Sequence, residues 1–212
     1  MSSLEIVKAS ARLAAHVAAT PFVLSFKVRA AILGRDRAIQ SSTQLLSLVP
    51  GLTGQYLRRA FLSRTIEACH HTVVVEFGTT FSRAGARLDA EVYIGPGCHL
   101  GLVHVERDVL IAAGVHIPSG SKTHGFDDLT LAIREQPSAH RLVRIGAGSW
   151  IGAAAVVMAD VGANAVVGAG SVVTQPVPGG VVAAGVPSRV LRLRGDQARV
   201  VRARDEQPAC AR

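Results

Sequence analysis

The chain has 212 residues, of which 49% are hydrophobic and only 4% aromatic, with 21 glycines and a formal net charge of +8. This length allows one or two domains with a sizeable core, and the composition favours stacked aliphatic and small residues over an aromatic-rich interior. The charge comes almost wholly from arginine, and no basic run is interleaved with aromatic residues. A nucleic-acid partner is therefore disfavoured relative to an anionic membrane surface or a phosphorylated ligand.

Residues 1–70 are expected to form a helical region. Apolar residues recur at helical spacing up to Pro21, where a first helix should stop before a second begins. Ser41 and Ser42 are candidate N-caps for a short third helix, and 52–66 has the pattern of a fourth. We interpret these helices as a cap over the end of the following repeats, with a basic surface that docks on anionic lipid as the alternative.

From about Leu88 to Val173 the sequence repeats a six-residue phrase, in which an aliphatic residue is usually followed by a small one. Neither a helix nor an alternating strand generates this period, which is the signature of a parallel β-helix. The residues expected to stack inside are Leu88, Ile94, Leu100, Val105, Ile111, Ile117, Ile145, Ile151, Val157, Val161, Val167 and Val173. The two short steps, from Leu100 to Val105 and from Val157 to Val161, are interpreted as slips at corners.

The repeat defines the domain organisation. It is interrupted once, by an excursion at 121–144, which divides the β-helix of 71–190; a basic tail at 191–212 follows, either as a short helix or frayed. The uncharged stretch 161–188 is long enough for a membrane span, but its glycines, prolines and six-residue rhythm predict a solenoid instead.

Cysteine usage and the N-terminus bear on the compartment. Cys69, Cys98 and Cys210 are odd in number and lack CxxC spacing, which indicates reduced thiols. No basic region followed by an apolar run of signal-peptide length opens the sequence. We therefore expect a cytoplasmic protein, with peripheral contact at the inner face of the membrane left open.

Four motifs follow one another in the second half of the chain: Gly114 to Asp128, which contains His124; Ile145 to Gly152, which contains Trp150; 167–173; and Ala184 to Arg189, which reads Gly-Val-Pro-Ser-Arg at its end. This order resembles the left-handed β-helix O-acetyltransferases, both the maltose and galactoside acetyltransferases and, more closely, the sugar O-acetyltransferases of surface-polysaccharide clusters. The resemblance covers about 77–194. It implies a mainly β fold, a left-handed parallel β-helix with hexapeptide repeats behind an N-terminal α-helical cap.

The resemblance also implies the catalytic group. Transfer of an acetyl group from a thioester to a hydroxyl requires a base, and a histidine that titrates near neutrality suits this role. His124 lies on the excursion and matches the family's catalytic histidine, so it is expected to act as general base in a direct transfer. Asp127 and Asp128 are candidates to orient its ring or to bind the acceptor.

Acetyl-coenzyme A is the co-substrate that the resemblance implies. Small residues at corners suit the pantetheine arm, and arginines suit the phosphates. The family's coenzyme contacts fall on Trp150, Ala153, Ala169, Thr174, Gln175, Arg189 and Arg192. Gln175 departs from the lysine often found at its position. Arg194, Arg199, Arg202 and Arg204 are expected to be solvated.

Family members are trimers with each site between two subunits, so a homotrimer is expected, and no metal. The acceptor is expected to be a sugar, polysaccharide or glycolipid precursor; an antibiotic-like hydroxyl, serine or another small molecule is the alternative within the same chemistry. From other classes, a γ-carbonic-anhydrase-like zinc protein would use His99 and His104, and a non-catalytic β-helix scaffold is also open. His116 and His140 are expected on a face and a loop, and His70 and His71 carry no motif.

Overall fold

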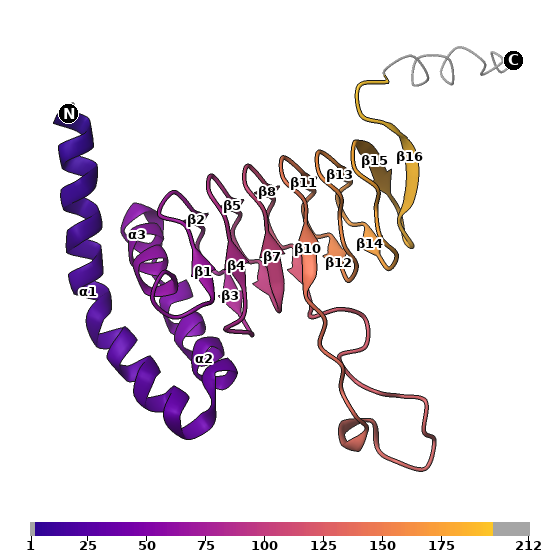
Figure 1. The fold of residues 1–212 in the computed structure, drawn as a ribbon, viewed down its shortest axis with the longest axis horizontal. Coiled ribbons are helices and arrows are strands. Elements are labelled where there is room, and N and C mark those ends of the chain that lie inside the picture. The colour runs from indigo at the N-terminus through magenta and orange to yellow at the C-terminus, as the bar shows by residue number, and fades with distance from the viewer. Residues whose placement is uncertain (1–2, 197–212) are drawn as a thin grey trace, which may run out of the picture.

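The computed structural model describes residues 3–196, which form three helices followed by a rod of short strands (Figure 1). The helices are α1 (Ser3–Leu33), α2 (Arg35–Ser47) and α3 (Gly51–Leu62). The strands are β1 (Ala68–Cys69), β2 (Val74–Val75), β3 (Thr80–Phe81), β4 (Arg87–Leu88), β5 (Tyr93–Ile94), β6 (His99–Leu100), β7 (Val103–Val105), β8 (Leu110–Ile111), β9 (His116–Ile117), β10 (Val143–Ile145), β11 (Trp150–Ile151), β12 (Val156–Val157), β13 (Val166–Val167), β14 (Val172–Val173), β15 (Val181–Ala184) and β16 (Arg189–Leu193). A short 3-10 helix, η1 (Ile133–Glu135), lies in the excursion.

The strands form three sheets, one on each face of the rod. The first sheet has the order β1-β4-β7-β10, the second β16-β15-β13-β11-β8-β5-β2 and the third β14-β12-β9-β6-β3. Consecutive strands from β1 to β15 belong to different sheets, whereas β15 and β16 are neighbours in the second sheet. All pairs are parallel except β15 with β16. This is a parallel β-helix, so the fold class expected from the repeat is confirmed.

The core is a stack of aliphatic side chains, and it contains every one of the twelve positions predicted from the hexapeptide period. Each of these side chains is at most 1% exposed. A second inward row lies two residues before each of them; most members are aliphatic, but Ser149 and Ser171 are polar and also buried. Burying one such aliphatic side chain stabilises the fold by about 1.5–3 kcal/mol, so the stacked rows account for the regularity of the coils.

The irregular steps share one corner of the rod, between the third sheet and the first. The step from Leu100 to Val105 joins β6 to β7, and the step from Val157 to Val161 leads from β12 to a bridge with Ile145 of the first sheet. The excursion joins β9 to β10 at the same corner. This corner thus accepts changes in length while the sheets on both sides stay in register.

The helices differ in three respects from the sequence-based expectation. α1 does not stop at Pro21 but continues to Leu33, changing direction near its middle (Figure 1). Proline removes one helical hydrogen bond, at the carbonyl of Val17; both Val17 and Pro21 lie on the exposed side of α1, so water can satisfy that carbonyl. α2 begins at Arg35, after Gly34 with φ 86°, and α3 ends at Leu62.

Ser41 and Ser42 therefore lie inside α2 and are not N-caps. Their hydroxyl groups donate to backbone carbonyls of α2, and both accept hydrogen bonds from the Arg29 guanidinium of α1. The helices cover the first coil: Phe61 and Phe26 pack edge to face, and both belong to the same buried cluster as Phe81 of β3. The helices thus cap that end of the rod.

Two apolar segments bear on membrane contact, one in α1 and the other at 161–188. Within residues 3–196, one helical segment, Val7–Leu33 of α1, is long and apolar enough to cross a membrane by length and composition alone. The uncharged stretch 161–188 instead forms β13 to β15 and the turn after them, as expected. β16 pairs antiparallel with β15, and Arg199, Arg202, Arg204 and Cys210 lie outside the described residues.

Candidate functional site

The excursion between β9 and β10 is closed at its base by hydrogen bonds between its outgoing segment, which follows β9, and its returning segment, which precedes β10. Arg141 N donates to Ser119 O over 2.8 Å, and Ala139 N donates to Lys122 O over 2.9 Å. The Ser119 hydroxyl, 4% exposed, also accepts a hydrogen bond from Leu102 N of the preceding coil. These contacts hold the loop at a defined place, from which it projects away from the rod (Figure 1).

Gln136 organises the tip of the excursion, and the sequence analysis missed it. Its side chain is 7% exposed and donates to Asp128 O over 2.7 Å and to Leu131 O over 3.1 Å. Its Oε1 accepts from Asp128 N over 3.1 Å. An isolated glutamine in a loop gives no sequence signal, because its role depends on which backbone groups the fold brings within reach.

His124 lies on the outgoing segment of the excursion, at a cavity of about 340 Å³. Residues of both the outgoing and the returning segment line the cavity: Lys122, His124, Gly125, Phe126, Asp127, Pro137 and Ala139. Gly125 packs tightly there, since a Cβ on it would lie 2.8 Å from Pro137 O. The imidazole of His124 is exposed and can meet a ligand that enters from solvent or from a neighbouring chain.

The two candidate aspartates have different surroundings. Asp127 lines the His124 cavity. Asp128 instead accepts two hydrogen bonds from Thr130, at 2.6 Å from the hydroxyl and 2.8 Å from the amide. These bonds lower the pKa of the Asp128 carboxyl, and they engage one of its oxygens in the local turn. Of the two, only Asp127 therefore lies at the His124 cavity.

A second histidine, His140, belongs to the returning segment of the excursion and lies close enough to His124 for the two side chains to interact electrostatically. Its Nε2 is hydrogen-bonded to the Arg83 guanidinium, which also pairs with Asp36 of α2 over 2.9 Å. The pKa of His140 is lowered, first by burial and then by Arg83 and His124, while Asp36 opposes the shift. His140 is a loop residue as expected, but its link to Arg83 could not be read from the sequence.

The residues expected to bind coenzyme A lie on the later coils, and none of them lines the His124 cavity. Trp150 points outward from β11 and is 51% exposed. Ala153 and Ala169 are exposed at the corner between the second and third sheets, where consecutive coils touch closely: a Cβ on Gly152 would lie 2.5 Å from Ala169 N. Small residues at this corner leave backbone groups accessible along the rod.

The remaining coenzyme candidates lie farther toward the end of the rod. Thr174 and Gln175 are exposed after β14, at the corner from which the excursion also leaves. Arg189 and Arg192 belong to β16, and Arg192 Nη1 donates to the carbonyls of Leu193 and Asp196. Arg194 is exposed, as expected, and its guanidinium also donates to Gly148 O and Asn164 O, over 3.4 and 3.2 Å, at the same corner of two successive coils.

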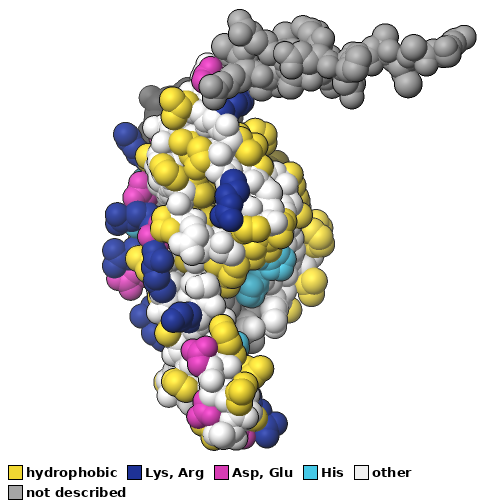
Figure 2. Space-filling model, turned by 90° about the vertical axis from the view of Figure 1, so that its right-hand side faces the viewer, with side chains coloured by type: hydrophobic (Ala, Val, Ile, Leu, Met, Phe, Trp, Pro, Cys, Tyr) yellow, Lys and Arg dark blue, Asp and Glu magenta, His cyan; other side chains and the backbone are white. Residues whose placement is uncertain are grey.

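The three faces of the rod differ in chemistry. The first sheet carries two ion pairs along its exterior, Glu67 with Arg87 and Glu106 with Arg144, and a hydrogen bond between His104 and Asp89. The exterior of the second sheet is a register-matched row of largely apolar side chains, Tyr93, Leu110, Trp150, Val166 and Val182. Figure 2 shows the same separation, with cationic side chains gathered on one flank and hydrophobic ones on the other.

The histidines of the zinc alternative are held by other groups. His99 Nδ1 is 2.8 Å from the Thr80 hydroxyl on the third sheet, whereas His104 Nε2 is 3.1 Å from Asp89 on the first. His116 follows His99 on the third sheet and is exposed, as expected. Among residues 3–196, no group of three or more histidine, cysteine, aspartate or glutamate side chains is arranged to hold a metal ion.

Comparison with known proteins agrees with this architecture. The chain is 40% identical to the galactoside O-acetyltransferase of Escherichia coli (strain K12) over 82 residues, which cover 33% of this chain and 40% of that protein. The alignment thus spans less than half of the relative's length. No protein-family model matches the chain.

Solved structures extend the similarity to most of the chain at the level of the fold. A maltose O-acetyltransferase from Clostridium difficile 630 aligns with 74% of this chain and 87% of its own, with a TM-score of 0.63 and 21% identity. A hexapeptide-repeat acetyltransferase from Vibrio cholerae covers 76% of this chain and 93% of its own, with a TM-score of 0.61 and 21% identity. A galactoside acetyltransferase in complex with coenzyme A covers 76% and 82%, with a TM-score of 0.56 and 23% identity. The chain therefore has the fold of the hexapeptide-repeat β-helix acetyltransferases and is homologous, in part of its length, to a galactoside O-acetyltransferase.

Proposed function

We propose that the protein is an acetyl-coenzyme A-dependent O-acetyltransferase acting on a hydroxyl of a sugar, polysaccharide or glycolipid precursor. The observation that carries this proposal is the single excursion of the rod, which presents His124 at a cavity of about 340 Å³ immediately before the coil of Trp150. The partial homology to a galactoside O-acetyltransferase and the shared fold with a coenzyme A complex support it.

In the proposed reaction the acceptor hydroxyl oxygen attacks the thioester carbonyl carbon, and His124 removes the hydroxyl proton as the new bond forms. The carbon–sulfur bond then breaks, the acetyl ester remains on the acceptor, and the thiolate of coenzyme A leaves and takes up a proton. No acyl-enzyme is needed. Backbone amides steady the negative charge on the carbonyl oxygen. Asp127, at the same cavity, orients the imidazole or binds an acceptor hydroxyl. Asp128, the next residue, is a second candidate for binding the acceptor.

Coenzyme A is proposed to lie along the later coils. The indole of Trp150 would flank the pantetheine arm, the exposed Ala153 and Ala169 would leave backbone groups free for it, and Thr174 and Gln175 would contact it farther along. Arg189 and Arg192 would bind the phosphates, because planar guanidinium groups match phosphate oxygens.

A homotrimer is proposed, because His124 and one part of the proposed coenzyme site, Trp150 and Ala153, lie at different corners of one chain. The excursion of His124 leaves from the corner between the third and first sheets, whereas Trp150 and Ala153 lie on the second sheet and at its corner with the third. A neighbouring rod packed against the apolar row of the second sheet would bring its own excursion to this corner. Cyclic symmetry suits a rod with three faces.

For its location we propose the cytoplasm, with peripheral docking at the inner face of the membrane. α1 packs on α2 and α3 through one side, and its opposite side carries an aliphatic stripe that is between 58% and 75% exposed: Val7, Leu13, Val17, Leu24, Val28 and Ile32. An amphipathic helix of this kind lies in the lipid interface, with cations such as Lys27 near anionic headgroups. Flotation with anionic vesicles tests it; a Leu24→Glu variant that floats as well as the parent protein would refute it.

The activity is tested by thiol release from acetyl-coenzyme A with a panel of sugar acceptors. His124→Ala is expected to lower the rate by about a hundred-fold or more, whereas His70→Ala, on the first coil, is expected to leave it unchanged. A loss of only a few-fold in His124→Ala would remove His124 from the role. If serine or an antibiotic-like hydroxyl is acetylated and sugars are not, the acceptor class proposed here is wrong.

The shared site is tested by complementation. Trp150→Ala and His124→Ala are each expected to be nearly inactive. Refolding a mixture of the two would place an intact His124 opposite an intact Trp150 in some trimers and partly restore the activity. Mixtures as inactive as their components, or a fully active monomer, would contradict a site made by two subunits.

A further inference from the structure

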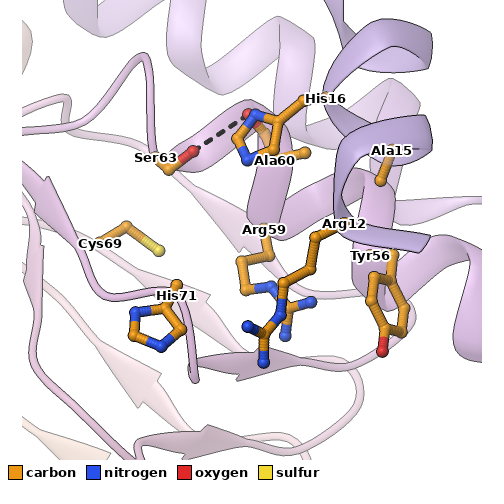
Figure 3. A pocket seen from close by; sticks show the side chains of 9 residues that line it. All are labelled: Arg12, Ala15, His16, Tyr56, Arg59, Ala60, Ser63, Cys69 and His71. Atoms are coloured by element: carbon orange, nitrogen blue, oxygen red, sulfur yellow. Dashed lines mark hydrogen bonds between the residues drawn. The ribbon is translucent and has the colours of Figure 1, made fainter. Parts of the chain in front are cut away.

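A second cavity lies at the opposite end of the rod from the later coils, between α1, α3 and the first coil. It has a volume of about 130 Å³. Figure 3 shows that its wall is basic: Arg12 and His16 come from α1, Arg59 from α3, and His71 from the turn between β1 and β2. Tyr56 closes one side, and no carboxylate lines the cavity. None of these residues belongs to the site proposed above for acetyl transfer.

The two guanidinium groups are not neutralised by the protein. In the part of the chain from 3 to 196, neither Arg12 nor Arg59 forms an ion pair. Arg12 Nε is buried and has no hydrogen-bond partner there. Arg59 stacks on the Tyr56 ring at 4.6 Å and donates to Val73 O at a long 3.4 Å. Leaving a buried donor of a charged group unsatisfied costs free energy, so Arg12 Nε indicates a missing acceptor.

The field inside the cavity is positive enough to perturb its neighbours. The pKa of His71 is lowered by slight burial, then by His70, Arg12 and Arg59, with Glu91 opposing. The pKa of His16 is lowered by burial and then by Arg64 and Arg59. Both arginines therefore act on groups that line the same space, as the convergence of their side chains in Figure 3 also shows.

Cys69 also lines this cavity, but it does not make it a thiol-based active site. Burial raises the pKa of the Cys69 thiol to about 12, and the opposing effect of Arg59 is smaller. The thiol stays protonated near neutral pH and is neither a good nucleophile nor a metal ligand. The chemistry left to the cavity is the binding of an anion.

We propose that this cavity binds a phosphoryl group, either of a free phosphorylated molecule or of a lipid headgroup. A planar carboxylate is satisfied by the fork of one arginine, whereas the oxygens of a tetrahedral dianion point in several directions and match donors from separate elements. Arg12 and Arg59 approach from two different helices, and His71 approaches from the first coil. The cavity, at about 130 Å³, is large enough to hold a phosphoryl group.

The test measures binding of inorganic phosphate to the full chain by calorimetry, with sodium chloride at the same ionic strength as reference. Arg12→Gln is expected to weaken binding about tenfold or more, because it removes a charge-assisted hydrogen bond. Arg59→Gln serves as a second variant, and circular dichroism confirms that both are folded. Arg107→Gln, an exposed arginine of the turn between β7 and β8, is the matched control and should bind phosphate like the parent.

The source of the phosphoryl group is distinguished with vesicles. Phosphatidylcholine vesicles that contain phosphatidic acid present a phosphate monoester, whereas phosphatidylserine at equal charge does not. If Arg12→Gln binds phosphatidic acid vesicles more weakly than the parent, the ligand is a lipid headgroup. If Arg12→Gln binds inorganic phosphate more weakly but binds these vesicles like the parent, the ligand is a free phosphorylated molecule. The proposal is overturned if Arg12→Gln and Arg59→Gln bind phosphate and vesicles as the parent does, or if phosphate acts no differently from chloride.

Discussion

The guanidinium of Arg83 donates to Nε2 of His140 and thereby connects the returning segment of the excursion to the first coils. Arg83 is itself held by Asp36 of α2 at 2.9 Å, and the second oxygen of Asp36 accepts from Ala84 N, also at 2.9 Å. We call Asp36, Arg83 and His140 the latch. It connects the N-terminal helices with the loop that carries His124, although its members are far apart in the sequence.

The latch is expected to weaken in acid. His140 accepts from Arg83 only when its imidazole is neutral, and its pKa in the folded protein lies below the ordinary 6.5. Because the unfolded chain then binds more protons than the folded one, the contribution of His140 is present above about pH 6.5 and declines as the pH falls toward its lowered pKa. Tryptic cleavage after Arg134, in the excursion, should accelerate over this interval.

A His140→Ala variant tests the same relationship without a change of pH. Cleavage after Arg134 should be several-fold faster than in the parent at pH 7.5, and acidification should change it less. His116→Ala, an exposed histidine on the third sheet, is the control. Equal cleavage rates in His140→Ala and the parent would show that the latch does not restrain the loop.

Trp150 is the only tryptophan of the chain and lies half-exposed on β11, so its fluorescence can report on coenzyme binding. Coenzyme A is expected to change the emission as the pantetheine arm displaces water from the indole. Ala169→Glu, at the corner expected to face the same arm, should weaken the response at least tenfold through bulk and charge. An unchanged emission at saturating coenzyme A would place the ligand elsewhere.

Gly54 in α3 is predicted to be indispensable for the packing of the helical cap. A Cβ at this position would lie 2.0 Å from Val49 O and 2.8 Å from Arg58 Nη1. Alanine normally stabilises a helix by about 1 kcal/mol relative to glycine, but here we expect Gly54→Ala to destabilise the protein by about 1–3 kcal/mol. Urea unfolding measures the change. Thr53→Ala, exposed on the same helix, should shift stability by less than about 0.5 kcal/mol.

Arg58 is predicted to hold the α2–α3 turn onto the first coil. Its side chain is 3% exposed, and it donates to Val75 O at 2.9 Å, to Leu46 O at 3.1 Å and to Val49 O at 2.6 Å. Arg58→Met would leave these carbonyls without their donor, at a cost of about 3 kcal/mol. In the same unfolding assay, the exposed Arg37→Met should change little; an equally small effect at Arg58 would contradict its structural role.

The parallel β-helix and its core follow from the amino-acid sequence. A six-residue period leaves one geometry in which the aliphatic residue that opens each phrase from Leu88 to Val173 is buried, so the inward rows and the place of the excursion follow from the pattern alone. The helical cap was foreseen only as a region. Whether Pro21 ends α1 depends on the exposure of the carbonyl at Val17, and the position of Ser41 within α2 depends on Arg29 of another helix.

Contacts between side chains that are distant in the sequence become visible only in the three-dimensional structure. The latch joins Asp36 to His140, and the basic cavity brings Arg12 and Arg59 together, although no sequence motif links these residues. The contacts of Gln136 within the excursion are likewise not marked by any motif. A local period constrains only neighbours in sequence and along the stacked coils. Contacts between a helix, a turn and a loop depend on how whole elements pack, and that information is not contained in any one segment.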